Sequence, residues 1–139
     1  MIIAVVDGMG GGIGAQLTQR VKRENLKGAI IIALGSNAVA AQRMVDAGAD
    51  RGASGENAIR VSVALADVIL GPIGIVLPNA MMGEITAAMT EAILAARAKK
   101  ILLPLAQSHV AIVGLAERTI GELVDEALAE LIQTLESMR

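Results

Sequence analysis

The segment IIAVVDGMGGGIGA, residues 2–15, joins an apolar run to a glycine-rich turn. Ile2 to Val6 contains no polar residue, which is typical of a strand buried on both faces of a parallel sheet. From Ile13 onward, apolar residues recur at the four-residue spacing of one helical face, and this pattern ends before Gly28. These residues predict a central strand, a glycine turn and an amphipathic helix in succession.

The alternation of buried strand and amphipathic helix continues along the chain. We predict further strands at residues 29–34, 50–53, 67–70 and 100–105, and a last short strand at 110–113. We predict helices around residues 37–48, 55–65 and 84–98, and a final helix that begins at the capping box of residues 119–122. Elements in this order form right-handed βαβ units. The predicted fold class is therefore α/β: a single-domain, three-layer αβα fold over residues 1–139 with a mostly parallel sheet of about five or six strands.

Composition excludes several classes of function. The 139 residues are 54% hydrophobic and include no Phe, Trp or Tyr. The 12 basic and 14 acidic residues are spread along the chain, so no basic stripe can follow a phosphate backbone and no aromatic ring can stack on a base. No apolar run reaches the roughly 20 residues of a membrane-spanning helix. We therefore expect neither a nucleic-acid partner nor a membrane partner.

The absence of cysteine bears on cellular location and on metal binding. A chain without Cys has no disulfides, thiolate nucleophiles or Cys-based zinc sites. No spacing of His, Asp and Glu matches a metal site. The opening MIIAVVDG lacks the charge and length of a signal peptide. We expect a cytoplasmic protein with no metal site, whose folded domain begins at Met1.

The glycine turn is the one specific functional signal. Glycines after a first strand permit a tight turn, let backbone N–H groups approach an anion, and let the following helix pack closely on the strand. The free N–H groups and the positive end of the helix dipole favour a phosphate group. The loop contains no Lys, which excludes a Walker loop. A turn that serves only to pack the helix on the sheet is the alternative interpretation.

Two nucleotide-binding patterns overlay this turn. Gly10, Gly12 and Ala15 satisfy G-x-G-x-x-A. Residues 8–14 satisfy G-x-x-x-G-I-G, which resembles the fingerprint of the short-chain dehydrogenases/reductases, with Asp7 where that family usually has Thr. The second pattern is the closer match.

The resemblance to short-chain dehydrogenases/reductases covers only the nucleotide-binding half, roughly residues 1–74. Gly71-Pro72-Ile73-Gly74 stands where that family has its Asn-Asn-Ala-Gly turn. The family's catalytic Tyr-x-x-x-Lys cannot exist in a chain without Tyr. The resemblance therefore implies nucleotide binding but not the family's chemistry.

Across most of its length the sequence is similar to a small, uncharacterised bacterial family of Rossmann-like proteins that is designated a domain of unknown function. The segments that carry this resemblance are AVVDGMGGGIG (4–14), ALGSNA (33–38), GASGENAI (52–59), ADVILGPIGI (66–75) and GEITAAM (83–89). The resemblance implies a fold, and it brings no activity, substrate or catalytic residue to carry over.

We expect the ligand to be a dinucleotide, NAD or NADP, or a related phosphate-containing molecule. The expected binding residues come from the glycine turn, from the end of the second strand and from a second crevice wall: Asp7, Gly8, Met9, Gly10, Gly11, Gly12, Ile13, Gly14, Gly35, Ser36, Asn37, Gly71, Pro72, Ile73 and Gly74. NAD sites usually carry an acid at the end of the second strand, and NADP sites carry an Arg nearby. This position has no acid, and Arg43 is expected on the solvent face of the next helix, so the choice of cofactor stays open. Ser36 and Asn37 also suit a helix-capping role.

Titratable residues near the predicted crevice have alternative roles. Asp7 is expected to cap N–H groups of the glycine turn, and Mg²⁺ or ribose binding is its alternative role. His109, the only histidine, follows the fifth predicted strand and is a weak candidate for acid–base catalysis, against the alternative of a hydrogen-bonded surface residue. Other polar and flexible residues also follow predicted strands: Glu56, Asn57, Asn79, Met81, Met82 and Glu84.

We therefore expect a protein that has a small-molecule nucleotide as its partner and that forms a homo-oligomer, such as a homodimer, through its large apolar fraction. Enzymatic activity stays open, and an oxidoreductase-like reaction is the class that such a site suits. The alternative is a non-enzymatic interaction or regulatory module whose glycine loop is structural or senses a nucleotide.

Replacing Gly12 with Val separates the binding interpretation from the packing interpretation. We expect the Gly12→Val protein to fold and to lose its nucleotide ligand, because a side chain at this position blocks the approach of an anion to the N–H groups. Circular dichroism and calorimetric titration measure the two properties. Unfolding of the variant without a separate binding defect would favour the packing interpretation.

Overall fold

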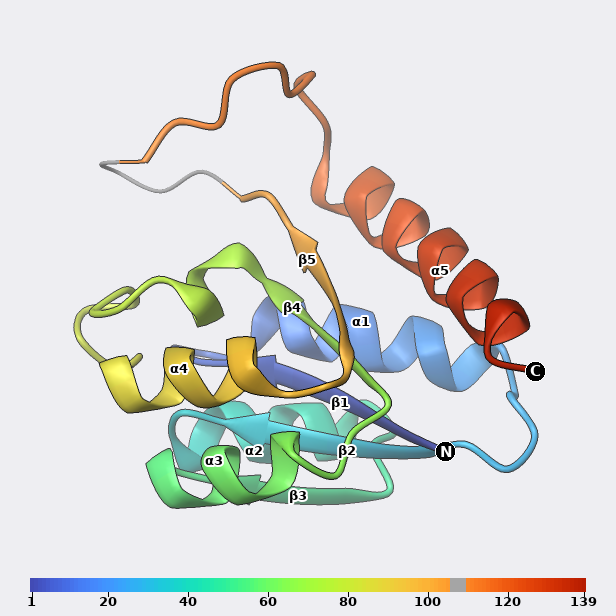
Figure 1. Ribbon diagram of the computed structural model, residues 1–139, viewed down its shortest axis with the longest axis horizontal. Helices are drawn as coiled ribbons and strands as arrows, with labels where there is room; N and C mark the ends of the chain where they lie inside the picture. Colours follow the sequence, from blue (N-terminus) through green and yellow to red (C-terminus); the bar gives the residue numbers. More distant parts are fainter. Residues whose placement is uncertain (106–109) are drawn as a thin grey trace.

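Five parallel strands form one sheet in the order β3-β2-β1-β4-β5 (Figure 1). The computed structural model describes residues 1–105 and 110–139. The strands are β1 (Ile2–Asp7), β2 (Ile30–Gly35), β3 (Arg51–Ser54), β4 (Val68–Pro72) and β5 (Lys99–Leu103). β1 is the central strand, as its wholly apolar sequence predicts, because it has a neighbouring strand on each edge and buried residues on both faces.

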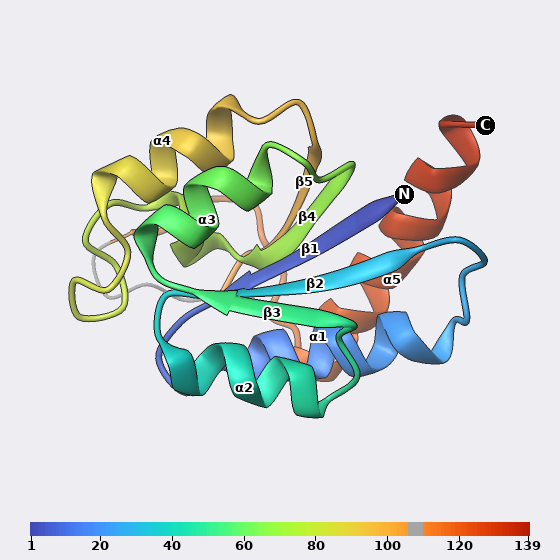
Figure 2. The ribbon, with the colours of Figure 1, turned by 90° about the horizontal axis from the view of Figure 1, so that it is seen from below.

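Helices cover both faces of the sheet, which confirms the α/β fold with three layers (Figure 2). The helices are α1 (Gly12–Arg23), α2 (Ala38–Asp46), α3 (Glu56–Val63), α4 (Ala87–Ala95) and α5 (Ile120–Ser137), with a short 3₁₀ helix at Ile73–Val76. α1, α2 and α5 lie on one face, and α3 and α4 lie on the other. None of the helices in the described ranges is both long and apolar enough to cross a membrane.

Two hydrophobic cores result from this arrangement. Ile3 and Val5 of β1 join the core under α1, α2 and α5, whereas Ala4 and Val6 join the core under α3 and α4. Alternate residues of a strand point to opposite faces of its sheet, so a strand between two cores must be apolar throughout. Leu131 of α5 is fully buried in the first core.

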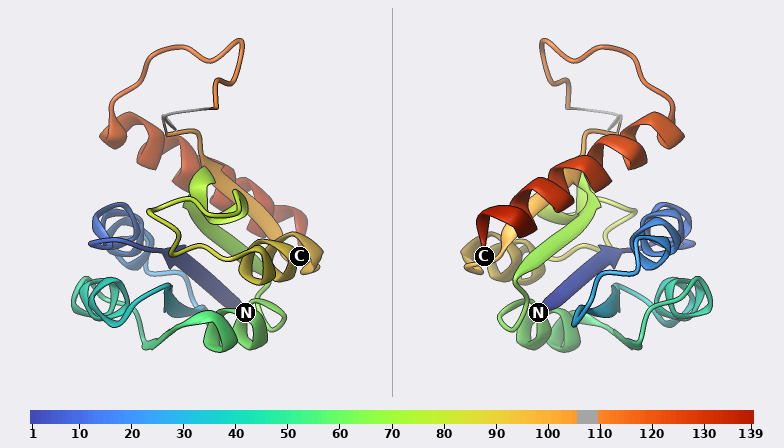
Figure 3. Two further views of the ribbon diagram at one scale, coloured as in Figure 1. Left: turned by 90° about the vertical axis from the view of Figure 1, so that its left-hand side faces the viewer. Right: turned by 90° about the vertical axis from the view of Figure 1, so that its right-hand side faces the viewer.

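Two sequence predictions differ from the structure. The strand predicted at residues 110–113 does not form: Val110 makes an isolated bridge, and Val113 is 96% exposed on a segment that leaves the body of the protein (Figure 3). A short apolar run becomes a strand only where a sheet edge pairs with it. The helix predicted at 84–98 is shorter, because Thr86 caps it at its start through Met89 N and Ala96 is extended at its end.

The strand order places a crevice at the centre of the sheet. From β1 the chain crosses in one direction to β2 and β3, and it then returns to the other side of β1 to form β4 and β5. In open α/β sheets such a reversal leaves a crevice at the carboxyl ends of the two strands that flank it. Those strands are β1 and β4, and the glycine turn follows β1 directly.

Truncation of Leu131 tests the packing of α5. We expect Leu131→Ala to lower the free energy of unfolding by about 2–5 kcal/mol, because it removes a fully buried side chain and leaves a cavity. Leu94→Ala is the matched control, since Leu94 is 57% exposed on α4, and we expect a change within about 0.5 kcal/mol. Urea unfolding followed by far-UV circular dichroism measures both, and equal effects would contradict the proposed packing of α5.

Candidate functional site

The carboxylate of Asp7 holds the two ends of the glycine turn together. Asp7 ends β1 and is 4% exposed. Its Oδ1 accepts a hydrogen bond from Gly8 N at 2.8 Å, and its Oδ2 accepts one from Gly14 N at 2.7 Å. The expectation that Asp7 caps the N–H groups of the turn is therefore confirmed.

Burial raises the pKa of the Asp7 carboxyl above its ordinary value, because the charged form loses its hydration. The hydrogen bonds from Gly14 and Gly8 act in the opposite direction. The negative charge of Glu84 raises this pKa further, and the positive charge of Arg43 lowers it. The two N–H groups thus compensate only part of the cost of a buried charge.

The turn itself uses a left-handed backbone at two positions. Gly11 N donates to Gly8 O at 2.9 Å, and Met9 and Gly11 have φ angles of 51° and 72°. A Cβ at Gly11 would lie 2.8 Å from Ala40 Cα, so only glycine fits there. The backbone N–H groups of Gly10, Gly12 and Ile13 have no acceptor in the described part of the chain.

The glycines divide into two groups by what surrounds them. A Cβ at Gly14 would lie 2.4 Å from Met44 Sδ and 2.8 Å from Asp7 Cβ, so Gly14 is needed for packing. At Gly12 the nearest atom to a Cβ would be Arg43 Nη1 at 3.5 Å, and at Gly10 it would be the same atom at 3.8 Å. These are ordinary contact distances. Packing therefore explains Gly14 but leaves Gly10 and Gly12 without a structural reason.

Arg43 brings a positive charge to the turn. It lies in the last turn of α2 and is exposed, as expected, but its Nη1 reaches Gly10 O at 3.3 Å. The guanidinium therefore lies beside the N–H groups at the start of α1. A guanidinium next to a helix N-terminus favours an anion.

Ser36 and Asn37, at the end of β2, connect to the turn in two ways. Asn37 Oδ1 accepts from Ala40 N at 2.8 Å, which confirms its role as the cap of α2. Its Nδ2 also donates to Met9 O at 2.8 Å. Ser36 N donates to the main-chain oxygen of Asp7 at 3.0 Å. The end of β2 and the glycine turn thus form one hydrogen-bonded unit.

Glu84 reaches this unit from the connection between β4 and α4. Its Oε1 accepts hydrogen bonds from Ser36 Oγ at 2.5 Å, from Asn37 Nδ2 at 2.7 Å and from Met9 N at 3.0 Å. The bond from Ser36, followed by those from Asn37 and Met9, lowers the pKa of the Glu84 carboxyl, although burial opposes this. The sequence places Glu84 after a predicted strand and at the start of the helix predicted at 84–98, and no local pattern relates it to Ser36.

The same connection covers Gly8. A Cβ at Gly8 would lie 2.6 Å from Met81 Sδ and 2.4 Å from Ser36 Oγ. Asn79, Met81 and Met82 all have left-handed φ angles, of 67°, 57° and 57°. Such angles are uncommon outside glycine, and they cluster at functional sites. The Met81 side chain of this left-handed segment therefore covers Gly8, the first glycine of the turn.

The predicted second wall begins at the same edge of the sheet. A Cβ at Gly71 would lie 2.4 Å from Val6 O, so this glycine lets β4 approach β1 closely. Pro72 ends β4, and Ile73 starts the 3₁₀ helix. Ile73 also lines a cavity of about 300 Å³ together with Leu105, Ile112 and other mostly apolar residues.

Other predicted residues lie elsewhere. Glu56 Oε1 accepts from Thr86 Oγ1 at 2.6 Å, which joins the start of α3 to the cap of α4. His109 lies outside the described residues. Within the described ranges, no three His, Asp or Glu side chains are grouped so that they could hold a metal ion.

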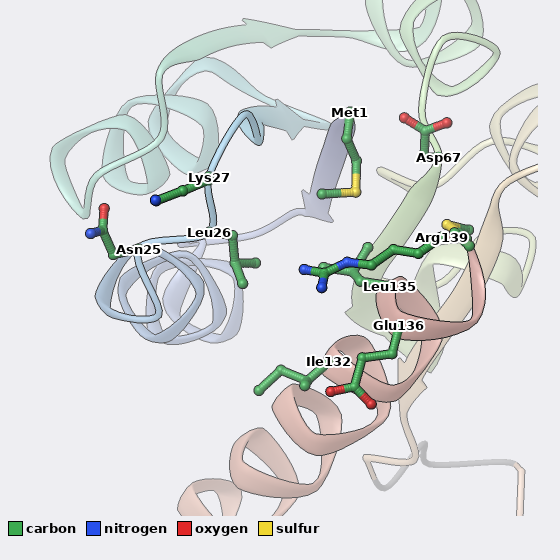
Figure 4. A pocket seen from close by; sticks show the side chains of 10 residues that line it. Met1, Asn25, Leu26, Lys27, Asp67, Ile132, Leu135, Glu136 and Arg139 are labelled. Atoms are coloured by element: carbon green, nitrogen blue, oxygen red, sulfur yellow. The ribbon is translucent and has the colours of Figure 1, made fainter.

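A cavity of about 640 Å³ opens at the opposite edge of the sheet (Figure 4). Its lining comes from the connection between α1 and β2, from Asp67 before β4 and from the end of α5. Asp67 Oδ2 accepts from Ile2 N at 2.7 Å, so its carboxylate pairs with the start of β1. The amino ends of the strands meet at this edge, so the cavity is separate from the glycine turn.

A parallel sheet in this order, with a glycine turn at its central crevice, defines a Rossmann-like α/β protein. The chain belongs to the family described as Domain of unknown function (DUF3842), whose model matches residues 2–136.

One solved structure with the same fold is described as the native structure of mycobacterial Rv1454c complexed with NADPH. The two proteins are 21% identical, with a TM-score of 0.50 over 98% of this chain and 45% of the other. This chain therefore spans less than half the length of that protein, and the likeness concerns the fold alone. No curated protein matches the sequence.

The raised pKa of Asp7 predicts a pH dependence of stability. The folded state holds the Asp7 proton more tightly than the unfolded state, so this contribution to stability is complete below about pH 4 and is lost as the pH rises through the raised pKa. Asp7→Asn removes this titrating group. The substitution also lowers the stability by an amount that does not vary with pH, because the amide has one acceptor oxygen for the two N–H groups of Gly8 and Gly14.

We therefore expect the stability advantage of the wild type over Asp7→Asn to shrink as the pH rises. Urea unfolding at a series of pH values, followed by far-UV circular dichroism, gives this difference directly. An advantage that grows with pH would contradict the assignment.

Proposed function

We propose that this protein binds a nicotinamide dinucleotide at the carboxyl edge of β1, β2 and β4. The pyrophosphate lies at the free N–H groups of Gly10, Gly12 and Ile13, at the start of α1. The remaining expected residues surround it: Asp7 to Gly14 form the turn, Gly35 to Asn37 border the adenosine half, and Gly71 to Gly74 form the wall on the nicotinamide side.

The observation that carries this proposal is the open space at two glycines. Packing requires glycine at Gly11 and Gly14, but a Cβ at Gly10 or Gly12 would meet only ordinary contacts with Arg43. Gly10 and Gly12 instead leave their N–H groups accessible, which is the use of such glycines in pyrophosphate binding. A turn that served only to pack α1 would not need them.

The charge and the position of the turn support the same function. Arg43 adds a guanidinium beside the N–H groups, and the dipole of α1 adds a partial positive charge. The turn lies at the central crevice of the sheet, where ligands of this fold class bind. The mycobacterial protein of the same fold is described as complexed with NADPH, which agrees with the proposed ligand class.

The protein's own residues account for binding rather than for a chemical step. A bound nicotinamide dinucleotide supplies or accepts a hydride. Apolar side chains around Ile73 line a cavity of about 300 Å³ on the proposed nicotinamide side. Asp7 holds the turn in its binding conformation before the ligand arrives.

Calorimetric titration tests the proposed function. The purified protein is titrated with NAD, NADP, their reduced forms, FAD and ATP, each with and without Mg²⁺. We expect saturable micromolar binding of a nicotinamide dinucleotide. If none of these ligands gave a detectable heat of binding, the result would contradict the proposal and favour an interaction module with a structural glycine turn.

Arg43→Gln tests the location of the pyrophosphate. We expect affinity for the dinucleotide to fall about tenfold or more, because a charge-assisted hydrogen bond is lost. Arg60→Gln on α3 is the matched control, since Arg60 is exposed on the other face of the sheet, and we expect its affinity to equal that of the wild type. Equal affinities of all three proteins would place the phosphates elsewhere.

A further inference from the structure

We propose that Glu84 binds the adenosine ribose of the dinucleotide and makes the site selective for NAD(H) over NADP(H). This inference rests on the proposed function. It assigns to Glu84 the role of the acid that the end of β2 lacks, although Glu84 comes from the connection between β4 and α4.

The position of the carboxylate supports this role. In dinucleotide-binding folds the ribose diol is held at the end of the second strand, beside the glycine turn. Glu84 Oε1 contacts Ser36 Oγ and Asn37 Nδ2 at the end of β2, at 2.5 and 2.7 Å. It also contacts Met9 N, in the turn, at 3.0 Å. The carboxylate therefore joins the same two elements that a ribose would join.

The hydrogen bonds also leave one carboxylate oxygen available. All three donors bind Oε1, and Oε2 has no partner among residues 1–105 and 110–139. An ionised carboxylate accepts hydrogen bonds through both of its oxygens. Oε2 is therefore held in place as an acceptor for a ribose hydroxyl. A glutamate carboxyl is ionised near neutral pH, and the hydrogen bonds that lower the pKa of Glu84 favour the charged form further.

The distribution of charge decides between the two cofactors. A phosphate on the ribose 2′ oxygen would bring a second negative group against Glu84, and like charges at contact are unfavourable. Arg43 would have to neutralise this repulsion, but its guanidinium lies at Gly10 and Gly12, on the pyrophosphate side of the turn. A ribose with a free 2′-hydroxyl donates to Glu84 instead.

Space for the ribose comes from Met81. Its Sδ would lie 2.6 Å from a Cβ at Gly8, so its side chain covers the first glycine of the turn. A methionine side chain is unbranched and flexible, and the backbone of Met81 and Met82 is left-handed. Displacement of the Met81 side chain opens the position beside Glu84 and leaves the hydrogen bonds of Oε1 in place.

The experiment compares NADH and NADPH affinities of the wild type, Glu84→Gln, Glu84→Ala and the control Glu91→Gln, an exposed position of α4. We expect the wild type and the control to bind NADH at least about tenfold more tightly than NADPH. Glu84→Gln and Glu84→Ala should lose about tenfold in NADH affinity while NADPH affinity stays the same or rises. Circular dichroism checks that each variant is folded.

Each other result overturns the inference in a distinguishable way. A wild-type preference for NADPH, or none, overturns it without any variant. Tighter binding of both cofactors by Glu84→Ala shows instead that the carboxylate occupies the ligand's position and competes with it. A preference that survives in both Glu84 variants excludes Glu84 as its source, whereas a wild type that binds neither cofactor overturns the proposed function as well.

Discussion

The geometry of the glycine turn depends on one buried carboxylate. Asp7 is enclosed at the end of β1, and its two oxygens accept from Gly8 N and Gly14 N. A buried carboxylate without such donors would be strongly unfavourable, so the turn must close around it. This closure sets where α1 begins relative to β1. It also engages the N–H groups of Gly8 and Gly14, while those of Gly10, Gly12 and Ile13 stay available in the described part of the chain.

Charges of opposite sign contact the glycine turn. Arg43 donates a hydrogen bond to Gly10 O, and Glu84 accepts one from Met9 N. A site with one positive and one negative side favours a ligand that has an anionic part and a neutral hydroxyl-bearing part. A dinucleotide with an unmodified adenosine ribose has this distribution, because its pyrophosphate is charged and its ribose diol is not.

Sequence patterns predicted the elements that bury apolar residues, and they failed where burial was not the deciding factor. The apolar runs that form β1, β2 and β4 can bury the side chains of both faces only between two layers of helices. Residues 110–113 have similar β-branched composition, but they leave the sheet and stay exposed. α4 begins at Ala87 and not at Glu84. Asn79, Met81, Met82 and Gly83 have left-handed φ angles, and the backbone hydrogen bonds of this segment hold Glu84 and Ile85 outside the helix. Strand pairing and turn closure are non-local properties, so a local pattern does not contain them.

The sequence by itself determined the alternating α/β order, the central place of β1 and the glycine turn that follows it, because each depends on residues adjacent in the chain. The contact of Glu84 with Ser36, 48 positions away, was decided only by the tertiary structure. The sheet order brings the connection after β4 over the end of β2, and no spacing along the chain encodes that approach. The tertiary structure likewise shows that packing requires glycine at Gly14 but not at Gly12. This difference depends on the side chains of α2. Their positions follow from the packing of that helix against α1.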